Sequence, residues 1–287
     1  MISQPIKLTE CPRDAMQGIH DFIPTELKAA YINLLLQVGF DTIDFGSFVS
    51  PKAIPQMQDT AAVLKKLDLN NTRSKLLAII ANYRGAEDAA QYDEISYLGY
   101  PFSISETFQL RNANSTIQHA FDTVKYIQEL CTIQGKQLVV YLSMGFGNPY
   151  GDEWNVEIVQ DWSQKLIAEG IRIIALSDTV GVATPQQITD IYPALCKSFP
   201  QTEFGLHLHA TPDNWYDKID TAYKSGCRRF DSAIKGYGGC PMAADELTGN
   251  IATESLIAYL EKQNEPTGLN MDKFREAMEY SEKLFLI

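Results

Sequence analysis

The sequence lacks the long apolar runs that membrane proteins need. Within its 287 residues, no continuous apolar stretch approaches the roughly 18 residues of a membrane-spanning helix. The first residues, MISQPIKLTE, also lack the basic segment and following apolar run of a secretory signal peptide. We therefore expect a soluble protein of the cytoplasm that has no membrane partner.

Cysteine is scarce and never closely paired. The five cysteines stand far apart, at positions 11, 131, 196, 227 and 240, and no two of them form a CxxC pair. An odd number of widely spaced cysteines is not typical of a disulfide framework, and it agrees with a reducing compartment.

Positive charge is also in short supply. The 24 lysines and arginines are outnumbered by 36 aspartates and glutamates, which gives a formal net charge of −12. Because nucleic-acid binding depends on basic residues that neutralise phosphates, this balance argues against nucleic acid as a partner. It argues equally against adsorption to an anionic membrane, although a local basic pocket for a phosphorylated ligand stays compatible with it.

The sequence does contain a regular alternation of apolar runs and amphipathic segments. Runs such as LVVYL and IRIIAL are continuously apolar, which is typical of parallel strands buried on both faces. The expected strands are residues 6–11, 42–48, 75–81, 94–97, 137–143, 171–176, 203–209 and 229–233. The expected helices are residues 24–38, 54–67, 86–91, 116–134, 156–169, 185–198, 214–225 and 253–263, and glycines 39, 135, 170 and 226 mark four of their ends.

Eight successive strand–helix pairs predict a single α/β domain over residues 1–287, a (β/α)8 TIM barrel. Residues 271–286 predict an extra C-terminal helix beyond the eighth pair. An open doubly wound sheet is the alternative, but no GxGxxG loop follows the first strand. In a barrel the functional residues lie on the loops after the strands, and the unusual polar residues of this chain do follow the expected strand ends.

Two of the four histidines, His207 and His209, stand two residues apart in the expected seventh strand. Because side chains alternate along a strand, both imidazoles should project from one face. Together with Asp14, which follows the first strand, they provide one carboxylate and two imidazoles at the barrel mouth. This set suits Mg²⁺ or Mn²⁺, and Zn²⁺ would accept it as well. The plainer alternative is a pair of core histidines bonded to backbone carbonyls, with Asp14 in a salt bridge.

Further polar side chains are expected at the same mouth. Arg13 can place its guanidinium on a substrate carboxylate or a developing oxyanion, although most arginines are simple surface charges. Asp44 could brace Arg13 or assist proton transfer, whereas Asp178 suits polar support or substrate positioning better than the role of a base. Cys240 stands in a glycine-rich loop, residues 236–241, which could be an inert turn or a lid that delivers a proton donor.

Several segments, in order along the chain, resemble the 3-hydroxy-3-methylglutaryl-CoA (HMG-CoA) lyase family. Residues 11–17, CPRDAMQ, are similar to its GPRDGLQ segment, and residues 47–57, SFVSPKAIPQM, to its SFVSPKxxPQM run. Further matches are SDTVGVATP at 177–185, HLH at 207–209, GGCP at 238–241 and GNIATE at 249–254. The RD and HxH motifs are shared with relatives that condense acyl-CoA with keto acids, whereas the SFVSPK run and the GGCP loop point to the lyase branch.

This resemblance implies a metal-dependent barrel that cleaves HMG-CoA to acetyl-CoA and acetoacetate. Its small-molecule partner would be an acyl-CoA, and family precedent suggests a homodimer. The implied ligands of Mg²⁺ or Mn²⁺ are Asp14, His207, His209 and Asn250. Arg13 would stabilise the enolate of the departing thioester, and Cys240 would protonate it. The expected catalytic set is Arg13, Asp14, Asp44, Asp178, His207 and Cys240.

The sequence departs from the family pattern at three places. Asp44 replaces a glutamate and is one methylene shorter, which could weaken its grip on Arg13. Ala210 stands where the family's HxHDT motif has an aspartate, and the loop at 242–248 is more acidic than usual. An aldolase or condensing enzyme for another hydroxyacyl or keto acid therefore stays open, as does a metal-binding paralogue with weakened catalysis.

Overall fold

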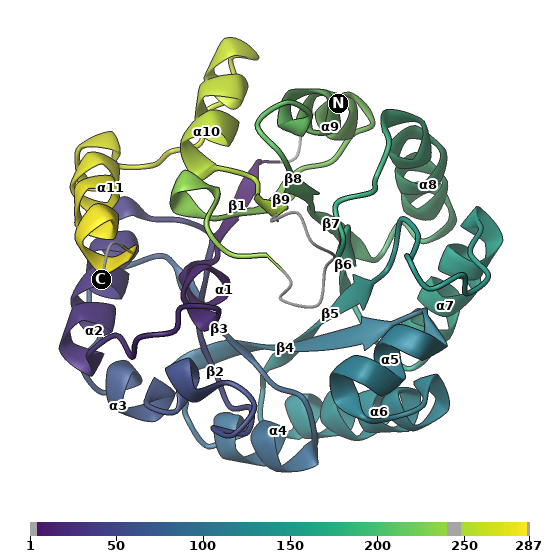
Figure 1. Cartoon of the computed structure of the whole chain (residues 1–287), viewed down its shortest axis with the longest axis horizontal. Helices are drawn as coiled ribbons and strands as arrows, with labels where there is room; N and C mark the ends of the chain where they lie inside the picture. The colour runs from purple at the N-terminus through teal and green to yellow at the C-terminus, as the bar shows by residue number, and fades with distance from the viewer. Residues whose placement is uncertain (1–4, 240–247, 286–287) are drawn as a thin grey trace.

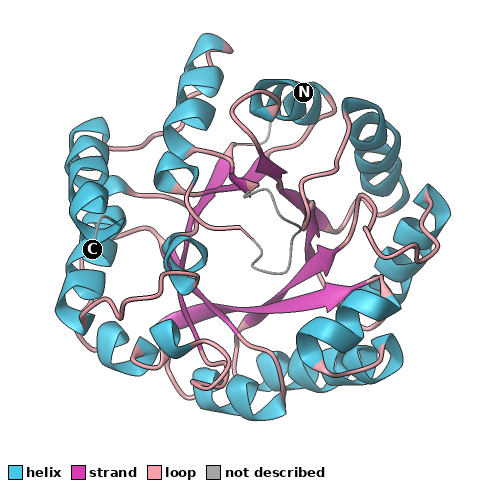
Figure 2. Cartoon of the chain, in the orientation of Figure 1, coloured by secondary structure: helices cyan, strands magenta, loops and turns pink. Residues whose placement is uncertain are grey.

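Eight parallel strands close into a barrel in the computed structural model, which describes residues 5–239 and 248–285. The strands neighbour one another in chain order, and the last one pairs back onto the first, so the predicted TIM barrel is confirmed (Figure 2). The barrel strands are β1 (Lys7–Glu10), β2 (Thr42–Ser47), β3 (Lys75–Ile79), β4 (Ile95–Ser103), β5 (Gln137–Ser143), β6 (Ile173–Ser177), β7 (Glu203–His207) and β9 (Arg229–Ser232).

Helices surround the ring of strands on its outside (Figure 1). They are α2 (Thr25–Val38), α3 (Thr60–Leu64), α4 (Tyr83–Ala90), α6 (Ile117–Ile133), α7 (Val156–Ala168), α8 (Pro185–Ser198), α9 (Trp215–Lys224) and α10 (Thr253–Lys262). The predicted C-terminal helix is α11 (Met271–Phe285), which packs on α2 with the rings of Tyr31 and Tyr280 stacked 6.2 Å apart. No helix in the described ranges is both long enough and apolar enough to cross a membrane.

Local signals explain where these helices begin and end. The four predicted helix-terminating glycines, at 39, 135, 170 and 226, all have a positive φ, between 67° and 94°, which a side chain would disfavour. Thr184 and Gln187 form a reciprocal capping box at the start of α8, next to Pro185 in its first turn.

The barrel interior is apolar on one side and charged on the other. Its apolar side consists of side chains from β3 to β6: Leu77, Ile79, Tyr97, Val139, Tyr141, Ile173 and Ala175. On the opposite side the guanidinium of Arg229 is buried and bonds Glu203 at 2.8 Å. Gly205 makes this possible, because a Cβ there would lie 2.8 Å from Cδ of Arg229.

The structure adds two helices that the sequence analysis did not predict, α1 (Pro12–Gln17) and α5 (Glu106–Ala113). Both are short, so their apolar periodicity spans barely two turns and gives little signal. The predicted helix at 54–67 is instead a 3-10 turn, η1 (Pro55–Met57), followed by α3. Strand β4 is longer than predicted and continues through Pro101. The last residue pair between β3 and β4 joins Ile79 and Gly99, so Pro101 lies beyond it and its missing N–H does not interrupt the β3–β4 ladder.

The prediction of one continuous strand through both histidines was wrong. β7 ends at His207, and His209 belongs to β8 (His209–Ala210), which pairs antiparallel with β10 (Gly249–Asn250). A second 3-10 turn, η2 (Ile234–Gly236), leads from β9 towards this small sheet. The break between β7 and β8 is important because the β8–β10 pair places Asn250 next to His209.

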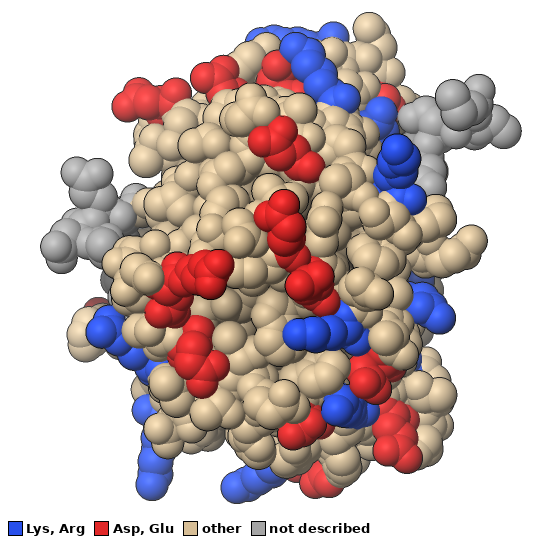
Figure 3. Space-filling view, turned by 90° about the vertical axis from the view of Figure 1, so that its right-hand side faces the viewer, with Lys and Arg blue, Asp and Glu red and all other residues tan. Residues whose placement is uncertain are grey.

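One face of the molecule carries charged side chains of both signs (Figure 3). On the face seen in Figure 3, acidic and basic side chains are interspersed among uncharged ones, without a continuous basic patch on that face. This distribution accompanies the net charge of −12.

Candidate metal and active site

A cavity of about 440 Å³ opens at the carboxyl ends of the barrel strands. Sequence analysis expected function at this mouth, and the cavity does lie there. Its lining includes four of the predicted site residues, Arg13, Asp14, His207 and His209. The remainder is largely apolar and contains Val49, Ile54, Ile79, Pro101, Phe108 and Tyr141.

Helix α1 places Arg13 and Asp14 at this cavity. Pro12 occupies its first turn, where a missing N–H costs nothing, and both functional side chains are buried. In Figure 1, α1 lies within the ring of strands instead of outside it. The two residues therefore reach the site from a helix that crosses the barrel mouth, and not from a loop as the sequence suggested.

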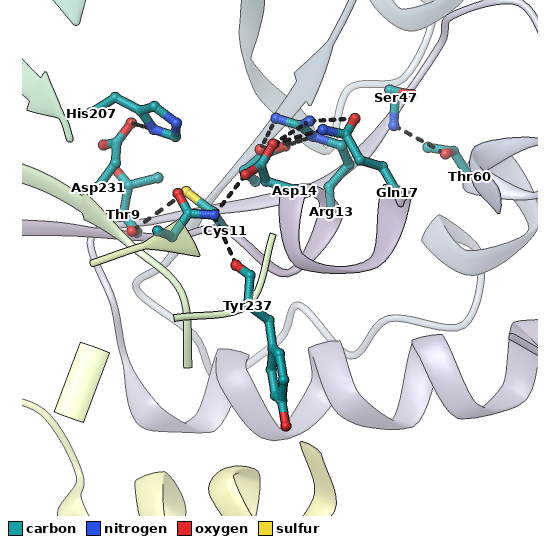
Figure 4. Close-up of polar contacts among 12 residues, drawn as sticks. Thr9, Cys11, Arg13, Asp14, Gln17, Ser47, Thr60, His207, Asp231 and Tyr237 are labelled. Carbon is teal, nitrogen blue, oxygen red and sulfur yellow. Dashed lines mark hydrogen bonds and ion pairs between the residues drawn. The ribbon is translucent and has the colours of Figure 1, made fainter. Parts of the chain in front are cut away.

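Arg13 is held on two sides by carboxylates (Figure 4). Its Nε and Nη2 donate to Asp44 Oδ2 at 3.0 and 2.6 Å, and its Nη1 donates to Asp14 Oδ1 at 3.0 Å. Gln17 accepts a further bond from Nη1 at 2.9 Å. Asp44 thus accepts hydrogen bonds from both Nε and Nη2 of Arg13 although it is shorter than the family's glutamate.

The two carboxylates differ in their protonation behaviour. Burial raises the pKa of Asp44 to about 6, against the opposing charge of Arg13. Burial also acts to raise the pKa of Asp14, but the charges of Arg13 and the two histidines, with the Asn250 amide, outweigh it and lower the pKa to about 2. Asp14 is therefore a permanent anion at neutral pH, as a metal ligand must be.

Asp14, His207 and His209 form a group that could hold a metal ion, with ligand atoms all within 4.8 Å of one another. The Nδ1 of His209 faces the carbonyl oxygen of Thr179 at 3.1 Å, and its Nε2 is buried without a hydrogen-bond partner among residues 5–239 and 248–285. Burial and the neighbouring His207 lower the pKa of His209 to about 4. A neutral imidazole with a buried free nitrogen is the form that binds a metal.

Asn250 completes the group. Its amide nitrogen donates to Asp14 Oδ2 at 2.6 Å and to the carbonyl oxygen of Tyr237 at 2.9 Å. Its Oδ1 is buried and, like Nε2 of His209, has no partner among the described residues. Carboxylate, imidazole and amide donors with two unsatisfied ligand atoms fit a divalent ion of the Mg²⁺ or Mn²⁺ type.

Asp178 lies outside the cavity lining, among buried groups behind it. Its carboxylate accepts a hydrogen bond from Nζ of Lys218 at 2.6 Å and another from the backbone N–H of Ala183 at 3.0 Å. Lys218 Nζ also donates to the carbonyl oxygens of His209 and Gly181, at 2.7 and 2.9 Å. This geometry agrees with polar support by Asp178 rather than with direct contact to a substrate.

Two buried acids near the site were not predicted from the sequence, Glu10 and Asp231. Asp231 Oδ2 lies 3.3 Å from Nδ1 of His207, and Glu10 accepts hydrogen bonds from the Thr253 hydroxyl and the backbone N–H of Ile234. Burial acts to lower the pKa of His207, but the bond to Asp231 and its charge outweigh this and raise it. Both Glu10 and Asp231 could have been noticed in the sequence, because each is an acidic residue inside a predicted buried strand.

Two departures noted in the sequence have different outcomes. Cys240 and residues 241–247 lie outside the described residues. Ala210 is buried and pairs with Gly249 in the small sheet, so this position supplies no carboxylate to the metal group.

Comparison with known proteins places the chain in a family. The HMGL-like family model matches residues 6–280. The mitochondrial hydroxymethylglutaryl-CoA lyase of Mus musculus is 32% identical over 282 residues, which cover 97% of this chain and 85% of the relative. The corresponding lyase of Bacillus subtilis is 32% identical over 272 residues, 95% of this chain and 90% of the relative.

Solved structures agree with this relationship. The crystal structure of the Bacillus subtilis HMG-CoA lyase superposes with a TM-score of 0.91 at 32% identity, covering 97% of this chain and 93% of that one. An HMG-CoA lyase of Acinetobacter baumannii, solved with coenzyme A and 3-methylmalate, superposes with a TM-score of 0.90 at 32% identity, covering 99% and 92%. The barrel, the metal-type group and these matches agree, and the chain belongs to the HMGL-like family.

Proposed function

We propose that this protein is a metal-dependent carbon–carbon lyase that cleaves HMG-CoA to acetyl-CoA and acetoacetate. The observation that carries the proposal is the convergence of Asp14, His207 and His209 beside a braced arginine in one cavity, with Asn250 bonded to Asp14. The 32% identity to HMG-CoA lyases over nearly the whole chain supports the choice of substrate.

The proposed metal ligands are Asp14, His207, His209 and Asn250, and the ion is Mg²⁺ or Mn²⁺ in preference to Zn²⁺. When bound, the ion would act as a Lewis acid and a template for the hydroxyl and carboxylate oxygens of the substrate. The protein's own contribution is to orient these four donors in advance. Thr179 and Asp231 hold the imidazoles through Nδ1, and the Asn250 amide bonds Asp14.

Arg13 would stabilise the negative charge that develops on the thioester enolate as the carbon–carbon bond breaks. Asp44 engages its Nε and Nη2, which fixes the plane of the guanidinium. The Nη1 group bonds Asp14 and Gln17 and lies towards the proposed metal group. Asp44 therefore serves as a positioning residue for Arg13. A base removes the proton of the substrate hydroxyl as that carbon becomes the ketone of acetoacetate, and Cys240 is proposed to donate the proton that converts the enolate into acetyl-CoA.

Domain extent, small-molecule partner and assembly complete the proposal. The chain would act as one domain over residues 1–287, because α11 packs against α2 and extends the same fold. An acyl-CoA is the proposed small-molecule partner, since the Acinetobacter baumannii lyase was solved with coenzyme A. A homodimer in the cytoplasm follows the sequence-based expectation.

An assay of metal-loaded protein tests the proposal. Purified protein with Mg²⁺ or Mn²⁺ and HMG-CoA should form acetoacetate and acetyl-CoA in equal amounts. Arg13→Gln should lower kcat by about 10²–10³, the usual loss when a donor to a developing oxyanion is removed. Arg84→Gln is the matched control, because that side chain is 91% exposed on α4. Tight Mn²⁺ binding without any acetoacetate would contradict the lyase proposal.

Ala210 gives specific support to a second candidate, a lyase or condensing enzyme for a related acyl-CoA. The family motif has an aspartate here, and its absence removes one acidic group next to His209. The same assay with other hydroxyacyl-CoA thioesters distinguishes the two candidates. Ala210→Asp restores the carboxylate. The variant should raise HMG-CoA turnover if HMG-CoA is not the preferred substrate, and should not raise it if HMG-CoA is the preferred substrate.

A further inference from the structure

Cys11, His207 and Asp231 form a second cluster of metal-ligating side chains beside the proposed metal centre (Figure 4). Their thiol, imidazole and carboxylate ligand atoms all lie within 4.8 Å of one another. Cys11 follows β1, His207 ends β7 and Asp231 belongs to β9, so three separate segments converge there. Cys11 is 1% exposed and Asp231 is 3% exposed.

The cluster has unsatisfied ligand atoms. Asp231 uses Oδ2 for the contact with His207, while its Oδ1 is buried and has no hydrogen-bond partner in the described ranges. The thiol of Cys11 donates one long hydrogen bond, 3.8 Å, to the carbonyl oxygen of Thr9. Because an unpaired buried carboxylate oxygen is energetically costly, a cation between these groups would be stabilising.

The chemistry of the cluster differs from that of the proposed catalytic centre. A thiolate together with an imidazole and a carboxylate is a ligand set for Zn²⁺ or Cd²⁺, whereas Mg²⁺ avoids sulfur. Zinc binds sulfur and nitrogen at about 2.3 and 2.0 Å, so its tetrahedral ligands stand roughly 3.5 Å apart. Small side-chain rotations would bring the three atoms to that spacing.

Charge also balances at this position. On binding, Cys11 would release its thiol proton to solvent, so that one thiolate and one carboxylate neutralise a divalent ion. The HMG-CoA lyase motif GPRDGLQ has a glycine where this chain has Cys11. Such a thiol is therefore not a requirement of lyase chemistry.

We propose that Cys11, His207 and Asp231 form an inhibitory site for a soft divalent ion, Zn²⁺ or Cd²⁺. Because His207 belongs to both ligand sets, an ion held by Cys11 and Asp231 draws that imidazole away from Asp14 and His209. Occupancy of the soft-ion site weakens the binding of Mg²⁺ or Mn²⁺. The inhibitory part of this inference rests on the proposed lyase function, whereas the binding part does not.

Binding is tested on metal-free protein titrated with Cd²⁺, whose bond to a thiolate absorbs in the near ultraviolet. The absorption should appear in the unmodified protein, in Cys131→Ser and in Cys240→Ser, and should be lost in Cys11→Ser. Calorimetric titration should show Zn²⁺ affinity reduced more than about tenfold in Cys11→Ser and in Asp231→Asn, since even losing an outer-shell partner costs that much. Cys11→Ala replaces Cys11→Ser if the latter folds poorly.

Separate results would contradict the proposed binding of the soft ion and the proposed inhibition. Absorption that survives Cys11→Ser, or disappears in Cys240→Ser, overturns the site whether or not the protein cleaves HMG-CoA. With Mn²⁺ and HMG-CoA, Cys11→Ser should keep its basal turnover and need more than about tenfold more Zn²⁺ for half inhibition. Unchanged Zn²⁺ inhibition in that variant overturns the competition through His207. If no turnover exists, direct competition between Zn²⁺ and Mn²⁺ for the protein replaces this assay.

Discussion

Asn250 lies directly opposite His209 in the antiparallel pair that β8 makes with β10. Opposite residues in such a pair present their side chains on the same face, so the backbone register itself sets one ligand beside the other. Nε2 of His209 and Oδ1 of Asn250 are both buried, and neither has a hydrogen-bond partner in the part of the chain that the structure describes. The small sheet is therefore the device that completes the proposed metal shell.

Replacement of Asn250 tests this arrangement. Asn250→Ala removes the amide oxygen and the bond to Asp14, and we expect Mn²⁺ affinity to fall by about 10–100-fold. Calorimetric titration of metal-free protein measures the change. Asn70→Ala, at an exposed position, should bind Mn²⁺ as the unmodified protein does. Unchanged affinity in Asn250→Ala would remove Asn250 from the ligand set.

The pairing of Arg13 with Asp44 predicts strongly coupled effects on turnover. Arg13→Lys keeps the charge but loses the planar pair of donors to Asp44, so kcat should fall by about 10²–10³. Asp44→Asn should cost less alone and add little to Arg13→Lys, because both changes release the same guanidinium. Steady-state kinetics of the two single variants and the double variant give the coupling. Independent, multiplicative losses would show that Asp44 has a separate role.

Lys218 is predicted to be a major source of stability behind the site. Lys218→Met leaves the buried carboxylate of Asp178 without a cation. Removing one partner of such a buried ion pair costs about 3–5 kcal/mol of stability. Chemical denaturation should show this loss, and Lys218→Met with Asp178→Asn should recover part of it. Lys224→Met is the control on the same helix, because Lys224 is 69% exposed and should affect stability little. Equal stability of the two lysine variants would contradict the interpretation.

Glu10 should make stability depend on pH. Burial raises its pKa from an ordinary 4.5 to about 8. Between these values the folded protein keeps a proton on Glu10 that the unfolded chain has released, so this contribution to stability falls as pH rises from 4.5 to about 8 and is constant above that.

The variant Glu10→Gln removes this proton uptake while keeping an oxygen for the N–H of Ile234 and an amide for Thr253. Thermal unfolding at pH 6 and pH 9 should therefore show a smaller loss of Tm at the higher pH in the variant than in the unmodified protein. The same pH dependence in both proteins would mean that Glu10 ionises normally in the folded state.

Some elements of the fold leave a clear local pattern in the sequence, and others do not. Buried parallel strands such as β5 are continuous apolar runs, and helix ends such as Gly39 need a residue that tolerates positive φ, so both leave local signals. Helix α1 leaves almost none, because six residues show less than two helical turns. The positions of Arg13 and Asp14 were predicted, but the helix that presents them was not.

Asp231 and Lys218 illustrate the same limit at the site. Each is an ordinary charged residue in the sequence. Its structural role depends on a partner distant along the chain, which is His207 for Asp231 and Asp178 for Lys218. No local pattern records such a pairing, because it depends on how neighbouring strand–helix units pack against one another.

The order of residues along the chain was enough to predict the alternation of strands and helices, the barrel that follows from it, and the residue types able to bind a metal. These follow from periodicity, local backbone preferences and side-chain chemistry, which act over a few residues. The tertiary structure decided which donors meet: it interrupted the seventh strand after His207, paired His209 with Asn250 and placed Cys11 and Asp231 against the same imidazole. The approach of Cys11 to Asp231 joins the two ends of the barrel and depends on closure of the ring between β1 and β9, whereas His209 meets Asn250 through the β8–β10 pair.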